Sequence, residues 1–151
     1  MVLWRISNHA DPSGTGGLLH GRRWHHRGRP VVYLAESPAG ALVEALVHVQ
    51  AASPAELPTN YELLEVALPE DASTVDVSPQ LDPSWREAPG TTRAMGDAWL
   101  AAQSSLLLRV PSAVVGRSFN RLLNPLHAQA ASCRVVSITR YPFDEQLLAQ
   151  H

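Results

Sequence analysis

A strand that passes directly into a helix is the feature of this sequence that most constrains its fold. The apolar run Val31-Val32-Tyr33-Leu34-Ala35 predicts a buried strand. Ser37-Pro38 follows at once, and a Ser N-cap with Pro in the first turn predicts a helix over about 38–51. The strand therefore connects the segment before it directly to this helix.

The rest of the chain is richer in strands than in helices. Alternating or apolar stretches predict further strands at 2–6, 61–68, 73–77, 106–110 and 134–139, and a second helix over about 92–103. Turn residues predict a loop at 11–17, and a Pro-rich loop at 77–90 with one turn around Trp85. Because strands outnumber helices without regular alternation, we expect an α+β fold with a mixed or antiparallel sheet and flanking helices.

Length and composition predict one compact domain over residues 1–151. Hydrophobic residues make up 45% of the chain, which suffices for a sizeable core. No stretch approaches the roughly 18 apolar residues of a membrane helix, and the start is not a signal peptide, so we expect a soluble, cytoplasmic protein. The single cysteine, Cys133, excludes an internal disulfide, and the absence of lysine excludes Schiff-base chemistry.

The charges are distributed unevenly along the chain. Residues 1–35 carry five Arg and one acid, residues 36–87 carry ten acids and one Arg, and the remainder carries six Arg and three acids. If the two basic ends meet in the fold, they form a positive cleft suited to a phosphorylated ligand, with the acidic stretch facing solvent or a partner. A scatter of solvated surface charge is the alternative.

Glu44 is the acidic residue with the least ordinary setting. On a helical wheel Leu42, Leu46 and Val49 occupy one side, and Glu44 lies opposite among mostly apolar residues. Such a helix is expected to be buried on most sides, where a carboxylate needs a partner or a function. Pairing with a core Arg and exposure at the helix edge are the structural alternatives.

The segment 20–29 is basic and contains three histidines. Its Arg side chains and glycines suit a pyrophosphate or a nucleic-acid backbone, although the sequence matches no Walker or dinucleotide motif. Adjacent side chains diverge, so His25-His26 is a poor metal site and we expect no metal. The basic loop, the strand with Tyr33 and the helix with Glu44 follow one another in the sequence. A basic residue, an aromatic ring and a carboxylate grouped in this way suit a nucleotide.

Six motifs spread over nearly the whole chain carry a resemblance to one known family. They are Trp4-Arg5-Ile6, Gly21-Arg22-Arg23-Trp24, Pro30-Val31-Val32-Tyr33-Leu34-Ala35, Ala41-Leu42-Val43-Glu44, Val110-Pro111-Ser112-Ala113-Val114-Val115 and Asn124-Pro125-Leu126-His127. In these the chain resembles the RES-domain toxins of bacterial toxin–antitoxin modules, named for an Arg, a Glu and a Ser. It departs from them after Trp24, where His replaces a frequent Asn, and before Asn120, where the usual acid is missing.

The resemblance implies a fold similar to ADP-ribosyltransferase toxins and an activity that consumes NAD as its substrate, with no other cofactor. Members break NAD down by hydrolysis or phosphorolysis, or transfer ADP-ribose to a protein. A cognate helix-turn-helix antitoxin of the Xre family, whose C-terminal region blocks the active-site cleft, is the implied partner, and a homodimer within a larger complex fits the family. No membrane or nucleic-acid partner is implied.

The motif positions also imply the site residues. The catalytic residues are Arg23, Tyr33, Glu44 and Ser112, and the substrate-binding residues are Arg5, Arg23, Tyr33 and Asn124. Glu44 is expected to stabilise positive charge on the ribose, Arg23 and Arg5 to hold the pyrophosphate, and Tyr33 to orient the nicotinamide. Ser112 is expected to fix a hydroxyl or the carboxamide.

Two other functions stay open at this point. In a metal-free ribonuclease the basic loop would bind RNA, with His25 or His26 as acid and base. In a binding module the domain would engage a partner without turnover. The sequence also leaves open whether the acceptor of the ADP-ribose is water, phosphate or a protein side chain.

Overall fold

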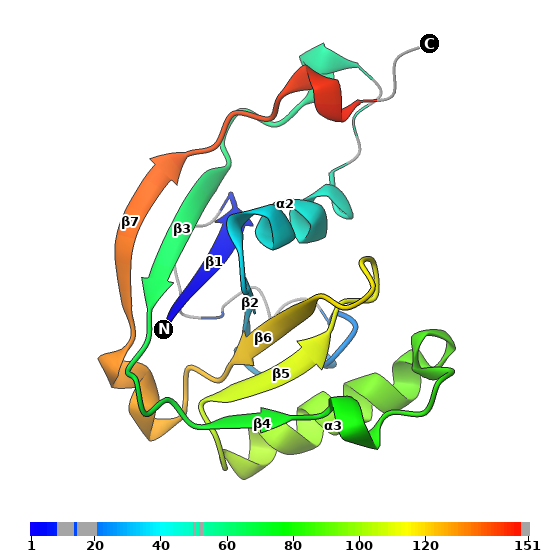
Figure 1. The fold of residues 1–151 in the computed structure, drawn as a ribbon, viewed down its shortest axis with the longest axis vertical. Coiled ribbons are helices and arrows are strands. Elements are labelled where there is room, and N and C mark those ends of the chain that lie inside the picture. The colour runs from blue at the N-terminus through cyan, green and yellow to red at the C-terminus, as the bar shows by residue number, and fades with distance from the viewer. Residues whose placement is uncertain (9–13, 15–20, 50, 52, 149–151) are drawn as a thin grey trace.

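The computed structural model describes residues 1–8, 14, 21–49, 51 and 53–148. In these residues seven strands form one sheet, accompanied by two α-helices and five short 3-10 turns (Figure 1). The strands are β1 (Val2–Ser7), β2 (Val32–Ala35), β3 (Glu62–Ala67), β4 (Thr74–Asp76), β5 (Leu107–Pro111), β6 (Phe119–Leu123) and β7 (Arg134–Arg140). The helices are α2 (Pro38–Leu46) and α3 (Pro89–Ala102), and the 3-10 turns are η1 (Pro54–Glu56), η2 (Ser78–Gln80), η3 (Trp85–Glu87), η4 (Ala128–Ser132) and η5 (Glu145–Leu147).

The sheet is mixed, and its strands run in the order β4-β5-β6-β2-β1-β3-β7. Only β4 and β5 pair in parallel, while the other neighbours are antiparallel. This confirms the predicted α+β class. The turn around Trp85 is present as η3, whereas most of the expected loop at 11–17 lies outside the described residues.

Strand β6 was not expected from the sequence. Only its last two residues are buried, and polar side chains interrupt its pattern. The strand is formed because β2 pairs with it on one side and β5 on the other. It therefore depends on its neighbours in the sheet more than on its own sequence.

Both helices cover the same face of the sheet. Side chains alternate between faces along a strand, so Tyr33 and Ala35 of β2 share one face, and Leu122 and Asn120 of β6 lie beside them. Ala35 packs against α2 in one apolar cluster, and Leu122 packs against α3 in another. A third cluster, which includes Leu34, fills the opposite face. Tyr33 thus lies in the gap between the two helices.

Helix α2 starts as predicted and ends earlier. The Ser37 hydroxyl accepts a hydrogen bond from the Gly40 amide, which confirms the N-cap. The helix ends at Leu46 instead of near residue 51, because the amides of His48 and Val49 bond three residues back and β-branched residues follow. The expectation of burial on most sides is wrong as well. Only Ala41 and Ala45 are buried, since the sheet covers one side of the helix.

Helix α3 holds the basic loop in place. The buried Thr92 hydroxyl donates to the Arg23 carbonyl at 2.6 Å, and Nε of Arg93 donates to the Arg22 carbonyl at 2.9 Å. At Gly96 the helix touches the loop so closely that a Cβ would lie 1.6 Å from the Trp24 carbonyl oxygen. Glycine is therefore the residue that permits this contact.

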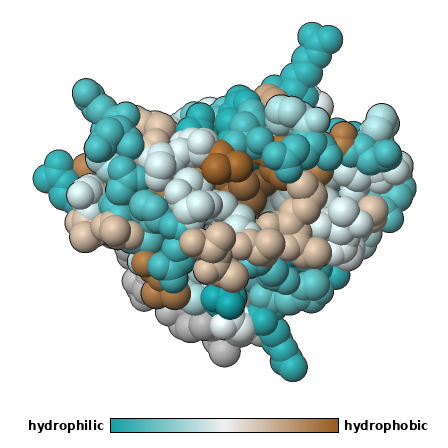
Figure 2. Space-filling view, turned by 90° about the horizontal axis from the view of Figure 1, so that it is seen from below, coloured by the Kyte–Doolittle hydropathy of each residue, from teal (hydrophilic) through white to brown (hydrophobic). Residues whose placement is uncertain are grey.

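No broad apolar area is visible on the face turned downward in Figure 1. Figure 2 shows this face as mostly hydrophilic or neutral, with small hydrophobic patches, one of them in a hollow near the middle. Among the residues that the structure describes, none of the helices has the length and apolar character needed to span a bilayer.

Candidate active site

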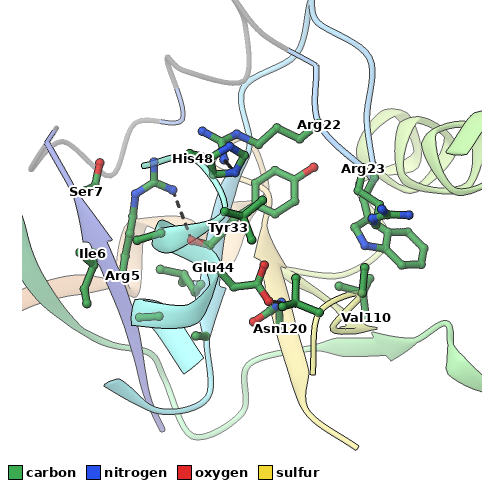
Figure 3. Close-up of a pocket in the computed structure, with 18 of the residues that line it drawn as sticks. Arg5, Ile6, Ser7, Arg22, Arg23, Tyr33, Glu44, His48, Val110 and Asn120 are labelled. Atoms are coloured by element: carbon green, nitrogen blue, oxygen red, sulfur yellow. Dashed lines mark hydrogen bonds between the residues drawn. The ribbon is translucent and has the colours of Figure 1, made fainter. Parts of the chain in front are cut away.

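A hollow of about 410 Å³ opens where the gap between the helices exposes the sheet. This volume lies within the range of about 300–1,000 Å³ that is usual for ligand pockets. Figure 3 shows Tyr33 and Glu44 in its middle, with Asn120 beside Glu44, Arg22 and His48 on the other side of Tyr33, and Arg5 and Arg23 toward opposite ends. Residues that are far apart in sequence therefore meet in one cavity.

The carboxylate of Glu44 is held by two donors. Ser112 Oγ and Asn120 Nδ2 both donate to Oε1 of Glu44 at 2.9 Å. The Ser112 oxygen in turn accepts from the amides of Val114 and Val115, each at 3.1 Å. This chain of hydrogen bonds fixes the direction of the carboxylate by its neighbours in the β5–β6 connection, and so preorganises it.

Arg22 lies over Tyr33 and is held by His48, which follows the end of α2. Its Nη1 donates to Nε2 of His48 at 2.7 Å, and its guanidinium carbon lies 5.9 Å from the centre of the Tyr33 ring. His48 must be neutral at Nε2 to accept this hydrogen bond. A neutral histidine, and not an acidic side chain, thus holds the guanidinium of Arg22 over the Tyr33 ring.

Arg5 is a second cation in the hollow. Its Nη1 donates to the Tyr33 carbonyl at 3.3 Å, while its Nε is buried and has no hydrogen-bond partner among the described residues. Burial and the positive charge of Arg22 lower the pKa of Arg5 to about 10. A buried donor without an acceptor costs free energy, so the site favours a ligand that brings an anionic acceptor.

Arg23 lines the hollow at some distance from this pair. Its Nη1 donates to the Arg86 carbonyl at 3.2 Å, and its guanidinium carbon lies 5.9 Å from the Trp85 ring. Both contacts come from η3. Arg23 is thus a cation at the far wall, already engaged by the protein.

The structure brings most of the expected site residues together. Arg5, Arg23, Tyr33 and Glu44 line the one hollow. Ser112 does not line it and reaches it through Glu44, where we had expected a direct contact with ligand. Asn124 is elsewhere: it is buried and binds the Leu100 carbonyl and the Leu126 amide.

Three residues of the hollow were missed by sequence reasoning. Arg22 belongs to the same motif as Arg23, but only Arg23 was expected in the site. Both line the hollow, and it is Arg22 that lies over Tyr33. His48 shares the side of Glu44 on the predicted helix by its i, i+4 spacing, but it was not expected to be a site residue. Asn120 was noted beside the missing acid of the family pattern, but it was not expected near Glu44 because its strand was not predicted.

The basic ends of the chain do meet at this cavity. Arg5, Arg22 and Arg23 come from the first basic segment and Arg93 from the second, and all four line the hollow together with Glu44. The excess of positive charge suits an anionic ligand. A second hollow of about 410 Å³ lies beyond Glu44, and Glu44 and Asn120 line both.

The two histidines that suggested a ribonuclease lie apart. His25 is fully buried, with Nδ1 2.7 Å from the Tyr33 hydroxyl. His26 is exposed, and its Nδ1 lies 2.6 Å from Asp97 Oδ2. Because one is sealed from solvent and the other lies outside the hollow, they do not form an acid and base pair around a common substrate.

Acid is expected to weaken the contact between Arg22 and His48. Burial and the charge of Arg22 lower the pKa of His48, against an opposing effect of Glu44. The unfolded chain therefore takes up a proton on this side chain before the folded one does, and the free energy of unfolding falls as pH decreases below about 6.5.

Denaturant unfolding at about pH 7.5 and about pH 5.5 measures this loss, and His48→Gln should lose less stability over the interval than the unaltered protein. An NMR titration gives the His48 midpoint directly. A midpoint at or above the ordinary value of 6.5 contradicts the expectation.

The arrangement suits the cleavage of a bond next to an anionic group. Guanidinium groups hold phosphate oxygens, and a fixed carboxylate stabilises positive charge that develops on a nearby atom. An aromatic face between them offers a platform for a flat ring.

Comparison with known proteins gives consistent results. The RES domain family matches residues 2–144. A protein of Pseudomonas putida named Toxin Res is 48% identical over 135 residues, covering 89% of this chain and 92% of that protein. A Toxin Res of Yersinia enterocolitica is 38% identical over 155 residues, covering 97% of this chain and 99% of that protein.

Two further similarities add a name and a fold. A Sphingobium protein named Prs ADP-ribosylating toxin is 31% identical over 157 residues, covering 97% of this chain and 96% of that protein. A chain in the crystal structure of the M. tuberculosis MbcT-MbcA toxin-antitoxin complex superposes with a TM-score of 0.70 at 20% identity, covering 93% of this chain and 83% of that one. At this identity the superposition shows a shared fold.

Proposed function

The chain belongs to the RES domain family, and from this membership and the geometry of the hollow we propose that it is the toxin of a toxin–antitoxin module that consumes NAD. The observation that carries the proposal is the meeting of Glu44, fixed by two hydrogen bonds, with a group of arginines across Tyr33 in one cavity. NAD combines an anionic diphosphate with a ribose that becomes positive as nicotinamide leaves. The two sides of the cavity match these two parts.

Each residue has a role in the proposed cleavage. Arg5 and Arg22 bind the diphosphate by charge-assisted hydrogen bonds, with Arg23 at the far wall. The Tyr33 ring faces the nicotinamide. The C–N bond to the ribose breaks, and its electron pair goes to the ring nitrogen of nicotinamide. Glu44 stabilises the positive ribose and accepts the proton of the water that forms the new C–O bond.

Ser112 acts in this scheme as a positioning residue for Glu44. Ser112→Ala removes one of the two donors to Oε1, so the carboxylate loses its fixed direction. We expect kcat for NAD cleavage to fall about tenfold, with KM changed less, because the substrate-binding arginines are untouched.

The measurement is a steady-state assay of nicotinamide release, with Ser118→Ala, a nearby half-buried serine, as the matched control. An unchanged kcat in Ser112→Ala would show that Glu44 does not need this hydrogen bond.

Incubation of the protein with NAD tests the proposed activity. Nicotinamide release, followed by chromatography and mass spectrometry in buffers with and without phosphate, is the expected result and identifies the product. Parallel incubation with RNA addresses the ribonuclease alternative. RNA cleavage without nicotinamide release would overturn the proposal, and NAD binding without turnover would favour a binding module.

Transfer of ADP-ribose to a protein is the second candidate. The name of the Sphingobium relative, Prs ADP-ribosylating toxin, favours it. The second hollow, which also reaches Glu44, offers an acceptor a separate approach to the same carboxylate. Mass shifts on proteins of a cell extract supplied with NAD would distinguish transfer from breakdown.

We further propose that a cognate Xre-family antitoxin closes the hollow with its C-terminal region. The M. tuberculosis MbcT-MbcA structure that shares this fold is a toxin-antitoxin complex. At the mouth of the hollow Val47 and Val114 are 54% and 52% exposed, and such apolar side chains beside a charged cavity favour a partner. The homodimer and the cytoplasmic location stay predictions.

A further inference from the structure

One histidine of the basic loop is buried behind the tyrosine of the hollow. His25 has no solvent exposure, and its Nδ1 lies 2.7 Å from the Tyr33 hydroxyl. The two rings are 5.6 Å apart and tilted by 45°. Nothing in the proposed cleavage uses this side chain, although it touches a residue that lines the hollow.

We assign the Tyr33 hydroxyl as the donor of this hydrogen bond. Burial raises the pKa of Tyr33 far above its usual value, so the hydroxyl keeps its proton. Nδ1 of His25 is then the acceptor, and we assign the imidazole as the neutral tautomer with its hydrogen on Nε2.

The hydroxyl end of Tyr33 is directed away from Glu44, as Figure 3 shows. The part of Tyr33 that the hollow receives is therefore its ring. Arg22 lies over this ring, and His48, in the turn after α2, holds Arg22. A tyrosine has two side-chain torsions, and a hydrogen bond at the far end restrains both. His25 thus sets the orientation of the ring from behind, while His48 sets the position of Arg22.

His25 is not placed to exchange protons with a ligand. It is enclosed by protein, and Tyr33 lies between it and the hollow. Its imidazole contacts Tyr33 at the phenol hydroxyl.

We propose that His25 is a positioning residue for substrate binding, which holds the Tyr33 ring in the orientation that receives the nicotinamide of NAD. The inference rests on the proposed function, since it concerns binding of NAD in the same hollow. Loss of the hydrogen bond frees the ring and weakens binding of NAD, while Glu44 and its two donors stay in place. Loss of this hydrogen bond is therefore expected to raise KM for NAD and to leave kcat nearly unchanged.

A double-mutant cycle tests this role. His25→Phe keeps a ring and removes the acceptor, and Tyr33→Phe removes the donor. Each is expected to raise KM for NAD about tenfold, with kcat within about twofold of the original value. Because both remove the same hydrogen bond, the double variant should show no further increase in KM. His25→Gln, which restores an acceptor, should recover most of the affinity.

The matched control is His127→Gln, because His127 lies outside the hollow and caps η4. Its KM should equal that of the unaltered protein. Fold changes that multiply in the double variant, or an unchanged KM in folded His25→Phe, would overturn the role of His25.

If His25→Phe does not fold, nitrogen NMR of the imidazole tests whether His25 accepts a hydrogen bond from Tyr33. The original protein should show a neutral His25 with hydrogen on Nε2, and the Nδ1 signal should move in Tyr33→Phe together with the rise in KM. An unmoved signal or an unmoved KM overturns the inference. If the original protein leaves NAD intact, the proposed function fails. Assaying the original protein therefore separates a failure of the proposed function from a failure of the inference about His25.

Discussion

Replacing Glu44 by Gln is expected to lower the rate of NAD cleavage at least about a hundredfold, equivalent to roughly 2.7 kcal/mol of barrier, while the protein stays folded. Glutamine keeps an oxygen that can accept from Ser112 and Asn120, so the geometry of the side chain is preserved. What disappears is the negative charge that, in the proposed cleavage, stabilises the ribose. Steady-state nicotinamide release and thermal unfolding, measured on the same sample, separate the two effects.

Glu65→Gln is the matched control for this variant. Glu65 is also half-buried and also accepts a serine hydroxyl, that of Ser137, at 2.9 Å, but it lies on β3 outside the hollow. The Glu65→Gln variant should cleave NAD at the rate of the unaltered protein. Near-normal cleavage in Glu44→Gln would remove Glu44 from the mechanism.

Gly96→Ala is expected to lower the free energy of unfolding by about 2 kcal/mol or more. The added Cβ would lie 1.6 Å from the Trp24 carbonyl oxygen, so helix α3 and the basic loop must separate. Alanine is otherwise the better helix residue by about 1 kcal/mol, which makes a loss of stability diagnostic of the clash. Denaturant unfolding measures it, and weaker NAD binding should accompany it because the loop carries Arg22.

Gly90→Ala provides the comparison within the same helix. A Cβ at Gly90 meets nothing within 4 Å, so this variant should be as stable as the original or more stable. Equal stability of the two alanine variants would mean that the loop does not rest on α3 as described.

Local patterns in the sequence predicted the elements that depend on local interactions. The Ser37-Pro38 start of α2 was predicted correctly, because an N-cap and a proline in the first turn act within a few residues. The end of α2 was predicted too late, because apolar residues continue past Leu46. The apolar pattern does not show that the amides of His48 and Val49 bond to carbonyls three residues back, where the α-helix has ended. Strand β6 was missed because pairing on both sides determines it.

The site residues likewise divide into those that local sequence indicated and those that only the pairing of distant strands brings into place. The sequence indicated Glu44 and Tyr33, one on a conspicuously apolar helix and the other in a buried strand that links it to the basic loop. The donors to the Glu44 carboxylate could not be placed, since Ser112 and Asn120 follow it by more than sixty residues and reach it only through the sheet. Asn124 matched a family motif, yet its amide serves the backbone of the core.

The position of β6 in the sheet has a consequence for the cell that makes this protein. This strand follows β1 to β5 in the chain, yet it inserts between β5 and β2 and brings Asn120 to Glu44. A nascent chain released only as far as β5 has neither that donor nor the neighbour that β2 requires. A partly translated chain therefore lacks the complete carboxylate site until β6 has been made and has paired with both of its neighbours.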